Sequence, residues 1–526
     1  MRATVTHDRL RSIVGVTDQR DSIEDALEAL ARDRLVANDT TELDELRPEL
    51  LALDLRGRPN AALLVATIEH QHRGPVEPTR ELAGQSLDEF TSRNDLEGMA
   101  LAQLLLGHIA FWEGDTVGAA KWWDAAADLP TAQATPAALA PFRVVLEHFD
   151  RGGYTQTIPQ AHQAYAVAMV EGSTVDEAHA TVIAGLVMID SGNLSRASET
   201  LLRAHDLFSE IESEILASMW PLVPLGLSEI AARRGDRDAA LEHYAEARSL
   251  ATRLERPGLL AVARAMPAVH LPYQCDLPWP IEEVLAEAEA AVAILRTQVV
   301  HPIVLQFLER AVAAAQIAVG EPSRALDTAG RDAEDAPNPL MRAKALMLVG
   351  SARIAMGQPD LAAAAFDEAL ETFIADGVDL WSVEALLELA DVRAEGASEA
   401  LEQAYRLTHD DPAFARLWAR RPRLVLDVTP GRRPQFRSGD DLLRLGTTGA
   451  ELAAIVIRAG DTGVHWETVA RELWPDEDGA ARIKSRITSL TALVRQRLGT
   501  EAWRLRRDGP RFSFILLEGD RMITGP

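Results

Sequence analysis

Residues 107–126 read GHIAFWEGDTVGAAKWWDAA, and the spacing of their small and large residues predicts a helix pair. Gly114 stands in a polar stretch, with Gly107 seven positions before it and alanines five and twelve positions after it. Trp123 stands nine positions after it. A glycine can end a helix in the left-handed conformation, and small residues at fixed offsets let paired helices approach closely. We therefore expect two packed helices joined at Gly114, with Trp123 filling the gap between them.

The same spacing recurs along the chain. Its glycines are Gly114, Gly192, Gly235, Gly320 and Gly357. Small residues stand seven positions before them, at Gly107, Gly185, Ser228, Ala313 and Gly350. Alanines follow at plus five, at Ala119, Ala197, Ala240, Ala325 and Ala362. Plus nine holds Trp123, Leu201, Tyr244, Ala329 and Phe366, and plus twelve holds Ala126, Ala204, Ala247, Asp332 and Ala369. The set resembles the tetratricopeptide repeat (TPR) signature at all four offsets in three repeats, and less well around Gly320.

The intervals between these glycines predict the extent of the repeat array. They are 78, 43, 85 and 37 residues, and halving the two long ones places degenerate repeats near Gly153 and Cys275. About seven helix pairs with a period near 40 result, against the usual 34, which resembles the TPR-like arrays of large bacterial regulators. We assign residues 96–420 to this array. Residues 1–95 are expected to be helical, as a cap or a divergent repeat, because terminal repeats are atypical.

Charge is divided unevenly along the chain. Residues 420–526 hold 19 Lys and Arg against 14 Asp and Glu, a net charge of +5, so the whole-chain charge of −27 leaves −32 for residues 1–419. Stacked helix pairs curve into a superhelix whose concave face binds peptides or helices. We expect that face to be acidic and to bind a protein or peptide of basic or mixed character. An acidic body repels phosphate, so any nucleic-acid contact should belong to the C-terminal residues.

The pattern changes at residues 421–526, which we expect to form a small α+β domain. RPRLVLDV and PQFRSGDDLLRLG alternate apolar and polar residues, as short strands do. Three helix-like segments follow, TTGAELAAIVIRAG, HWETVARELWPDED and a third from about Ala480. AWRLRRDGPRFSFILL then predicts a hairpin around Asp508-Gly509.

This order resembles the OmpR-type winged-helix DNA-binding domain, also found in the antibiotic regulatory proteins of actinomycetes, over roughly residues 422–518. LWPDED at 473–478 and VRQRLG at 494–499 look like the family's LWPDED bend and LRRKLG helix end. Two features depart from the family. Its wing turn G-x-G-Y is Gly509-Pro510-Arg511-Phe512 here, and the domain follows repeats with no recognised receiver domain before it.

A helical wheel of residues 482–498 predicts which side chains would meet DNA. An apolar stripe consists of Ile483, Ile487, Leu490, Val494 and Leu498. Candidate recognition-helix residues away from this stripe are Arg482, Lys484, Ser485, Arg486, Thr488, Ser489 and Arg495. The resemblance implies a wing that meets the minor groove or the backbone, with the candidates Arg504, Arg506, Arg507 and Arg511. Residues 482–511 carry nine basic and two acidic residues, which suits the phosphate backbone. Trp466 and Trp474 are expected to pack in the core.

Other functional classes find no support in the sequence. None of the three lysines follows a G-x-x-x-x-G run, so a P-loop is missing, and no catalytic constellation is present. We expect no metal and no cofactor, and read Glu69, His70 and His72 as a solvated helix face and Cys275 as a buried small residue. The N-terminus lacks the apolar segment of a signal peptide, and no run of about 18 apolar residues predicts a membrane span. We expect a cytoplasmic protein.

The sequence thus favours a mainly α protein: a TPR-like helical-repeat superhelix followed by a small α+β winged-helix domain. Its expected function is transcription regulation, with double-stranded DNA bound by the C-terminal domain and a protein or peptide by the array. The alternative is a TPR interaction scaffold or adaptor, not an enzyme either, whose winged helix docks on protein. Whether the chain forms a homodimer stays open.

Overall fold

The computed structural model describes most of the chain. The described residues are 10–15, 23–37, 43, 46–71, 76–131, 143–144, 154–171, 174–211, 217, 219–254, 256–270, 279–297, 302–393, 395–408, 418, 424–427, 435–438, 441–443, 445, 447–475, 480–517 and 520–523. Gly153 and Cys275, near which degenerate repeats are expected, lie outside them, as do Asp476, Glu477 and Asp478 of the LWPDED stretch.

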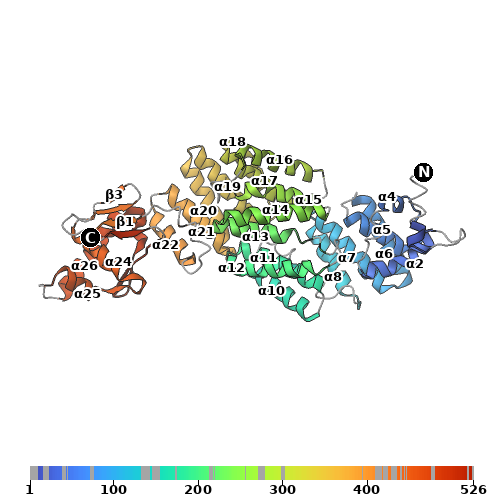
Figure 1. Cartoon of the computed structure of the whole chain (residues 1–526), viewed down its shortest axis with the longest axis horizontal. Helices are drawn as coiled ribbons and strands as arrows, with labels where there is room; N and C mark the ends of the chain where they lie inside the picture. Colours follow the sequence, from blue (N-terminus) through green and yellow to red (C-terminus); the bar gives the residue numbers. More distant parts are fainter. Residues whose placement is uncertain are drawn as a thin grey trace. The chain divides into compact units, whose positions relative to one another are not determined.

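Helices form the described part of the chain up to Thr408. They are α2 Ile23–Ala37, α4 Arg47–Leu50, α5 Pro59–Gln71, α6 Val76–Arg93, α7 Leu96–Trp112, α8 Thr116–Ala127, α10 Tyr154–Glu171, α11 Thr174–Asp190, α12 Leu194–Ser209, α13 Leu222–Arg234, α14 Arg237–Arg253, α15 Pro257–His270, α16 Ile281–Leu295, α17 Pro302–Ala318, α18 Pro322–Glu334, α19 Pro339–Ala355, α20 Pro359–Asp376, α21 Asp379–Val392 and α22 Ala397–Thr408. Consecutive helices pack as pairs, among them α7 with α8, α11 with α12 and α17 with α18 (Figure 1). The expected mainly helical fold with an array of helix pairs is confirmed.

The five glycines of the repeat pattern lie at turns between helices, as predicted. Their φ angles run from 72° to 89°. In this region a residue with a Cβ atom has a higher free energy than glycine. After Gly114, the Asp115 N–H donates to the Ala110 carbonyl at 2.9 Å, the long-range bond of a Schellman helix end. Equivalent bonds follow the other glycines: Asn193 to Met188, Asp236 to Ala231, Glu321 to Gln316 and Gln358 to Arg353.

The residue after the glycine also begins the next helix at three of these turns. The Asp115 carboxylate accepts from the Gly118 N–H at 2.8 Å, and Asn193 and Asp236 cap α12 and α14 in the same way. One residue thus satisfies the end of one helix and the start of the next. Asn94 (φ 55°) and Asp95 form the same turn between α6 and α7, although no glycine is present there. Since α5 packs on α6 and α6 on α7, helix pairing reaches back to Pro59.

The small residues before the glycines allow the paired helices to approach closely. A Cβ atom added at Gly107 would overlap the Trp123 ring, which is 1 % exposed. At Gly185 it would lie 2.7 Å from Leu201 Cδ2, closer than real Cβ contacts. The predicted role of Trp123 and Leu201, filling the space between paired helices, is confirmed.

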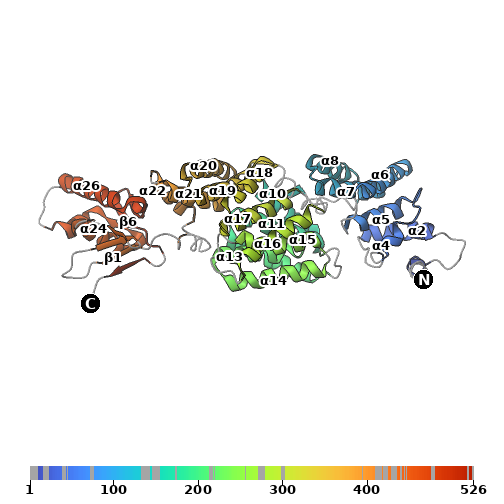
Figure 2. The same cartoon turned by 90° about the horizontal axis from the view of Figure 1, so that it is seen from above.

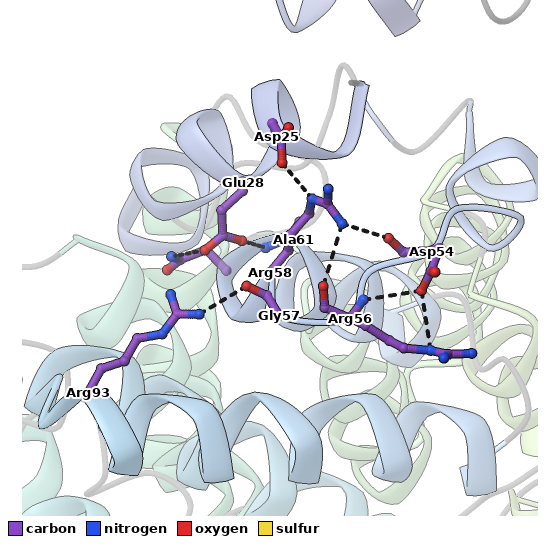
Figure 3. Close-up of polar contacts among 9 residues, drawn as sticks. Asp25, Glu28, Asp54, Arg56, Gly57, Arg58, Ala61 and Arg93 are labelled. Atoms are coloured by element: carbon purple, nitrogen blue, oxygen red, sulfur yellow. Dashed lines mark hydrogen bonds and ion pairs between the residues drawn. The ribbon is translucent and has the colours of Figure 1, made fainter. Parts of the chain in front are cut away.

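Residues 54–61 tie the first helices together (Figure 3). Glu28 of α2 accepts from the Ala61 N–H at 2.8 Å and from Asn60 Nδ2 at 2.7 Å, so its carboxylate stabilises the N-terminus of α5. Arg58 donates to Asp25 Oδ1 at 2.9 Å and to the Asp54 carbonyl at 3.1 Å. From α6, Arg93 donates to the Gly57 carbonyl at 2.9 Å. The turn at residues 56–60 is therefore a junction of three helices, α2, α5 and α6.

The repeat around Gly320 departs from the pattern because it buries a charge. Asp332, where other repeats have alanine, is 1 % exposed, and its Oδ2 accepts from Arg310 Nη1 at 3.3 Å. Asp332 Oδ1 has no hydrogen-bond partner. Burial raises the pKa of the Asp332 carboxyl to about 6, although the nearby Arg310 guanidinium opposes the shift.

We expect the stability of the array to depend on Asp332 between about pH 4 and pH 6. A carboxyl whose pKa is higher folded than unfolded favours folding when protonated, so this contribution is complete below about pH 4 and lost as pH rises through 6. The Asp332→Asn variant should therefore be more stable than the wild type at pH 8, by on the order of 3 kcal/mol in the free energy of unfolding. At pH 4 this difference should be much smaller. Denaturant unfolding at both pH values measures this. Asp327→Asn, exposed on the same helix, is the control, and equal effects of both variants would contradict the prediction.

Strands and three further helices form the C-terminal part. β1 Leu424–Asp427, β2 Gln435–Ser438, β3 Asp441–Leu443 and β7 Arg521–Ile523 make a sheet of order β3-β2-β1-β7, in which β7 runs parallel to β1 and the other pairs are antiparallel. β4 Val464–His465, β6 Arg511–Phe514 and β5 Leu505–Asp508 make a second, antiparallel sheet of order β4-β6-β5. The predicted order of strands, three helices and a hairpin is confirmed, but the hairpin does not close the chain, because β7 follows it and pairs with β1.

The three helices are α24 Thr447–Arg458, α25 Trp466–Leu473 and α26 Ala480–Leu498. α24 is buried from Gly449 to Ile457 except at Glu451, and Figure 2 shows it between α26 and the strands. Gly449 lets α24 approach α26 closely, because an added Cβ would lie 3.2 Å from Val494 Cγ2 of α26. Trp466 and Trp474 pack against the same core, as expected.

The C-terminal sheets and helices share a core with the last helix pair. Contacts divide the chain into two compact units, and the second comprises Arg233–Gly235, Arg353–Ile374 and Asp379–Pro526. Three rings, Tyr405 of α22, Trp418 and Trp503, meet with centroids 5.3–5.7 Å apart, and we call them the aromatic junction. Buried residues of α21 and α22 surround it, together with Ile515. The predicted boundary at 420/421 therefore falls inside one packed unit.

Candidate nucleic-acid interface

Helix α26 buries one stripe of its surface and exposes the opposite one. Ile487, Val494 and Leu498 are at most 3 % exposed, and Ile483 and Leu490 are half-buried against the same core. The predicted stripe is confirmed. Six of the seven candidates on this helix are exposed: Arg482, Lys484, Ser485, Arg486, Thr488 and Ser489. No acidic residue occurs between Ala480 and Leu498, so this face carries positive charge alone.

Two of these exposed side chains have a defined position. The Thr488 hydroxyl donates to the Lys484 carbonyl at 2.9 Å, so it is held against its own helix. The Arg486 guanidinium carbon lies 4.6 Å from the ring centroid of Trp474, which directly follows α25. This is a cation–π contact, which restricts an otherwise flexible side chain.

Arg495 does not join the exposed face. It is half-buried, and its Nη1 donates to the Leu505 carbonyl at 3.4 Å, so it connects α26 to strand β5. The prediction that Arg495 points away from the protein is wrong, because the hairpin lies beside that part of the helix.

The β5–β6 hairpin presents Arg507 and Arg511 at its tip. Asp508 pairs with Arg511 across a loop of Gly509 and Pro510, and Gly509 has a φ of 55°. Arg511 Nη1 donates to the Thr462 carbonyl at 3.0 Å, and Arg507 Nε donates to the Gly509 carbonyl at 3.2 Å. Both side chains are exposed. The tip is also held by the Trp466 N–H, which donates to the Pro510 carbonyl at 2.9 Å.

Arg504 is a structural residue and not part of an exposed wing. Its side chain is fully buried, Nε lies 2.6 Å from Glu501 Oε2, and Nη1 bonds Asp520 Oδ2. Asp520 also accepts from the backbone N–H groups of Leu424 and Leu517, at 2.6 and 2.7 Å. The prediction that Arg504 meets DNA is corrected, because this ion-pair network joins β1 to the C-terminal segment inside the core.

Arg506 points towards the repeat array. It is half-buried, its guanidinium carbon lies 4.9 Å from the Tyr405 ring centroid, and its Nε and Nη2 have no hydrogen-bond partner. The prediction that Arg506 lies on an exposed wing is therefore corrected as well. Arg504 ends the 3-10 helix Gly499–Arg504, which packs against α22, and Arg506 follows two residues later in β5.

Five of the predicted cations are exposed: Arg482, Lys484, Arg486, Arg507 and Arg511. On α25, the exposed carboxylates Glu467 and Glu472 lie near His465 and Arg458, at 3.7 and 3.6 Å. Positive charge is therefore concentrated on α26 and the hairpin tip and not on α25. Such a surface can hold a phosphate backbone beside a helix narrow enough for a major groove.

The array neutralises part of its own acidic charge. Glu97 pairs with Arg32 at 2.8 Å, Glu309 pairs with Arg296 at 2.7 Å, and Glu177 pairs with Arg203. A basic ligand would meet less free negative charge than the composition suggests. In the part of the chain described, no helix is long and apolar enough to cross a membrane.

Comparisons with known proteins find matches among solved structures alone. No protein-family model matches the chain, and no curated protein matches it. Among solved structures, a Rap protein complexed with Competence and Sporulation Factor is 12 % identical, with a TM-score of 0.45 over 70 % of this chain and 93 % of that one. A signal-transduction ATPase with a tetratricopeptide repeat sensor from Pyrococcus horikoshii is 13 % identical, with a TM-score of 0.35 over 70 % and 56 %. Yeast Tom70 is 15 % identical, with a TM-score of 0.35 over 80 % and 82 %. All three TM-scores lie below 0.5, so these are distant likenesses.

Proposed function

We propose that this chain is a cytoplasmic transcription regulator, not an enzyme, which binds double-stranded DNA through α26 and the β5–β6 hairpin. The observation that carries the proposal is the exposed face of α26, which has three cations and no acidic residue while its opposite stripe is buried in the core. This arrangement holds a positive helix rigidly at the surface of a chain whose net charge is −27. Solubility does not call for it, whereas phosphate binding does.

The helical-repeat array is the sensing part in this proposal. Stacked helix pairs offer extended surfaces to peptides and protein helices, and array proteins commonly act through them. Because α22 and the C-terminal sheets share one core, a partner that moved the last helices would also move the DNA-binding surface. Sensing and DNA binding thus have a direct physical connection.

DNA binding by the full-length chain should depend on the cations of α26. If all five exposed cations meet phosphates, the logarithm of the binding constant falls with the logarithm of salt concentration with a slope of about −4.5. Arg482→Gln with Lys484→Gln should weaken binding roughly 10-fold and flatten this slope by about two. Binding to a pool of genomic DNA fragments across a salt series measures both.

A control with the same loss of charge is Arg237→Gln with Arg331→Gln, both exposed in the array. It should leave the affinity and the slope unchanged. Equal effects of the two double variants would show that net charge alone governs binding. If the wild type retains no DNA at low salt, the proposal is wrong, and the scaffold whose C-terminal domain docks on protein becomes the better reading.

A further inference from the structure

Arg506 is a half-buried cation that lies against the last helix of the repeat array. Its guanidinium carbon is 4.9 Å from the ring centroid of Tyr405, a residue of α22. Its Nε and Nη2 atoms are buried, and neither has a hydrogen-bond partner. Arg504, two positions earlier, is instead paired with two carboxylates. Among the residues that the structure describes, the buried side of the Arg506 guanidinium is therefore compensated by an aromatic ring alone.

This position is unfavourable for an arginine. The guanidinium is always charged, and a buried N–H group without an acceptor has given up its hydrogen bond to water and gained none in return. A cation–π contact offsets only part of this loss. The contact persists because of the packing around it, since α22 packs on the 3-10 helix Gly499–Arg504 and Tyr405 belongs to the aromatic junction. The docking of α22, and not a hydrogen bond of its own, therefore holds Arg506 in place.

A released Arg506 would belong to the positive hairpin. It stands opposite Ser513 in the register of β5 and β6, next to Arg507. Arg507 and Arg511 are already exposed at the tip of this hairpin. Because the aliphatic stem of arginine is long, the guanidinium can leave the Tyr405 ring while β5 stays paired with β6. The hairpin would then present a third cation that can bind a phosphate.

We infer that Tyr405 and Arg506 form a latch that couples α22 to the hairpin. While α22 is docked, the ring withholds the Arg506 guanidinium from DNA. When α22 moves away, the guanidinium is released and adds one phosphate contact. This inference rests on the proposed function and deepens it, because it names a contact through which a change in the repeat array reaches the DNA-binding surface.

The test is DNA binding by the full-length chain across a salt series, with a pool of genomic DNA fragments as the probe. Tyr405→Leu removes the ring, so the affinity at low salt should rise roughly 3- to 10-fold and the salt slope should steepen by about one, as one added phosphate contact requires. Arg506→Gln alone should leave the slope unchanged and the affinity within about 2-fold of the wild type, because this charge is already withheld. Tyr405→Phe keeps a ring and should behave like the wild type.

The combined substitution identifies the cause of the gain. Tyr405→Leu with Arg506→Gln should return both affinity and slope to the wild-type values, because no cation is left to release. A gain that persists in this double variant would come from loosening of the aromatic junction and would overturn the latch. A slope that flattens by about one for Arg506→Gln alone would also overturn it, because Arg506 would then meet DNA while α22 is docked. If Tyr405→Leu does not fold, the slope of Arg506→Gln decides.

A second measurement tests the latch without DNA. Arg506→Met keeps an unbranched side chain over the ring and removes the unpaired N–H groups. Unfolding of the full-length chain in denaturant should therefore need a higher midpoint concentration than in the wild type. Arg507→Met, at the exposed neighbouring position, is the control and should leave the midpoint unchanged. A midpoint that does not rise for Arg506→Met would show that the docked guanidinium is well accommodated, and the latch would have no reason to open.

The failure of each proposal can be told apart. A wild type that binds no DNA overturns the proposed function and this inference with it. A wild type that binds DNA with the expected salt dependence, beside a folded Tyr405→Leu variant with unchanged affinity and slope, overturns the inference alone.

Discussion

Arg504→Ala should unfold the C-terminal part of the chain under conditions in which the wild type is folded. The guanidinium is fully buried between Glu501 and Asp520, whose side chains are 2 % and 1 % exposed. Removing it leaves two carboxylates in the core without a counter-charge, and breaking a buried pair in this way costs about 3–5 kcal/mol. We expect at least this loss in the free energy of unfolding, measured by denaturant titration with tryptophan fluorescence, since the Trp503 ring lies 5.5 Å from the guanidinium.

Arg507→Ala is the control for this variant, because it removes an arginine three positions later that is exposed. Its stability should stay within about 0.5 kcal/mol of the wild type. Glu501→Ala combined with Arg504→Ala should recover part of the loss, because one stranded carboxylate is then absent. A loss below about 1 kcal/mol for Arg504→Ala alone would show that water or another cation compensates the carboxylates, against the burial seen here.

Trp503→Ala should separate the C-terminal sheets from α22. The indole is fully buried, with its centroid 5.3 Å from those of Tyr405 and Trp418, and truncation of a buried tryptophan costs about 3–5 kcal/mol. Beyond this general loss, the backbone amides of α22 should exchange their hydrogens faster, because the helix loses the surface on which it packs. Hydrogen exchange measured by mass spectrometry on the full chain reports both regions at once.

The exchange rates of α7 and α8 provide an internal control, because these helices belong to the other compact unit. Trp503→Phe retains a ring and should show a smaller effect in the same peptides. If exchange rises evenly along the whole chain, the variant acts by global unfolding, and the aromatic junction does not specifically stabilise α22.

Local signals in the sequence were enough for the repeat turns. At Gly114 and its equivalents, the residue after the glycine donates its N–H to the carbonyl five positions before that residue, so each helix end is decided within a few residues of sequence. The helix caps at Asp115, Asn193 and Asp236 could be predicted in the same way, because each is an Asp or Asn directly after the glycine. Asn94 was harder to find, because it takes the place of glycine.

Exposure of the candidate site residues was predictable only where the packing of a single helix determines it. The wheel of α26 placed Arg482, Lys484 and Arg486 correctly, since burial of its apolar stripe fixes what remains outside. Arg495 and Arg504 were misplaced because their surroundings come from elsewhere in the fold: the hairpin for Arg495, and Asp520 for Arg504. Arg504 and Arg506 stand two positions apart in the sequence, but nothing in the sequence indicates that α22 packs against the 3-10 helix that ends at Arg504.

The aromatic junction also decides where this protein can be cut and rejoined. The change in composition near residue 421 suggests that residue as a fusion point. A segment that starts there would, however, contain Trp503 and Ile515 but not α21 and α22, which bury them. The exchangeable module begins no later than Asp379, at a turn between two repeat helices. Recombination that transplants the C-terminal domain to a new sensor, in evolution or in the laboratory, therefore has to carry the last helix pair along with it.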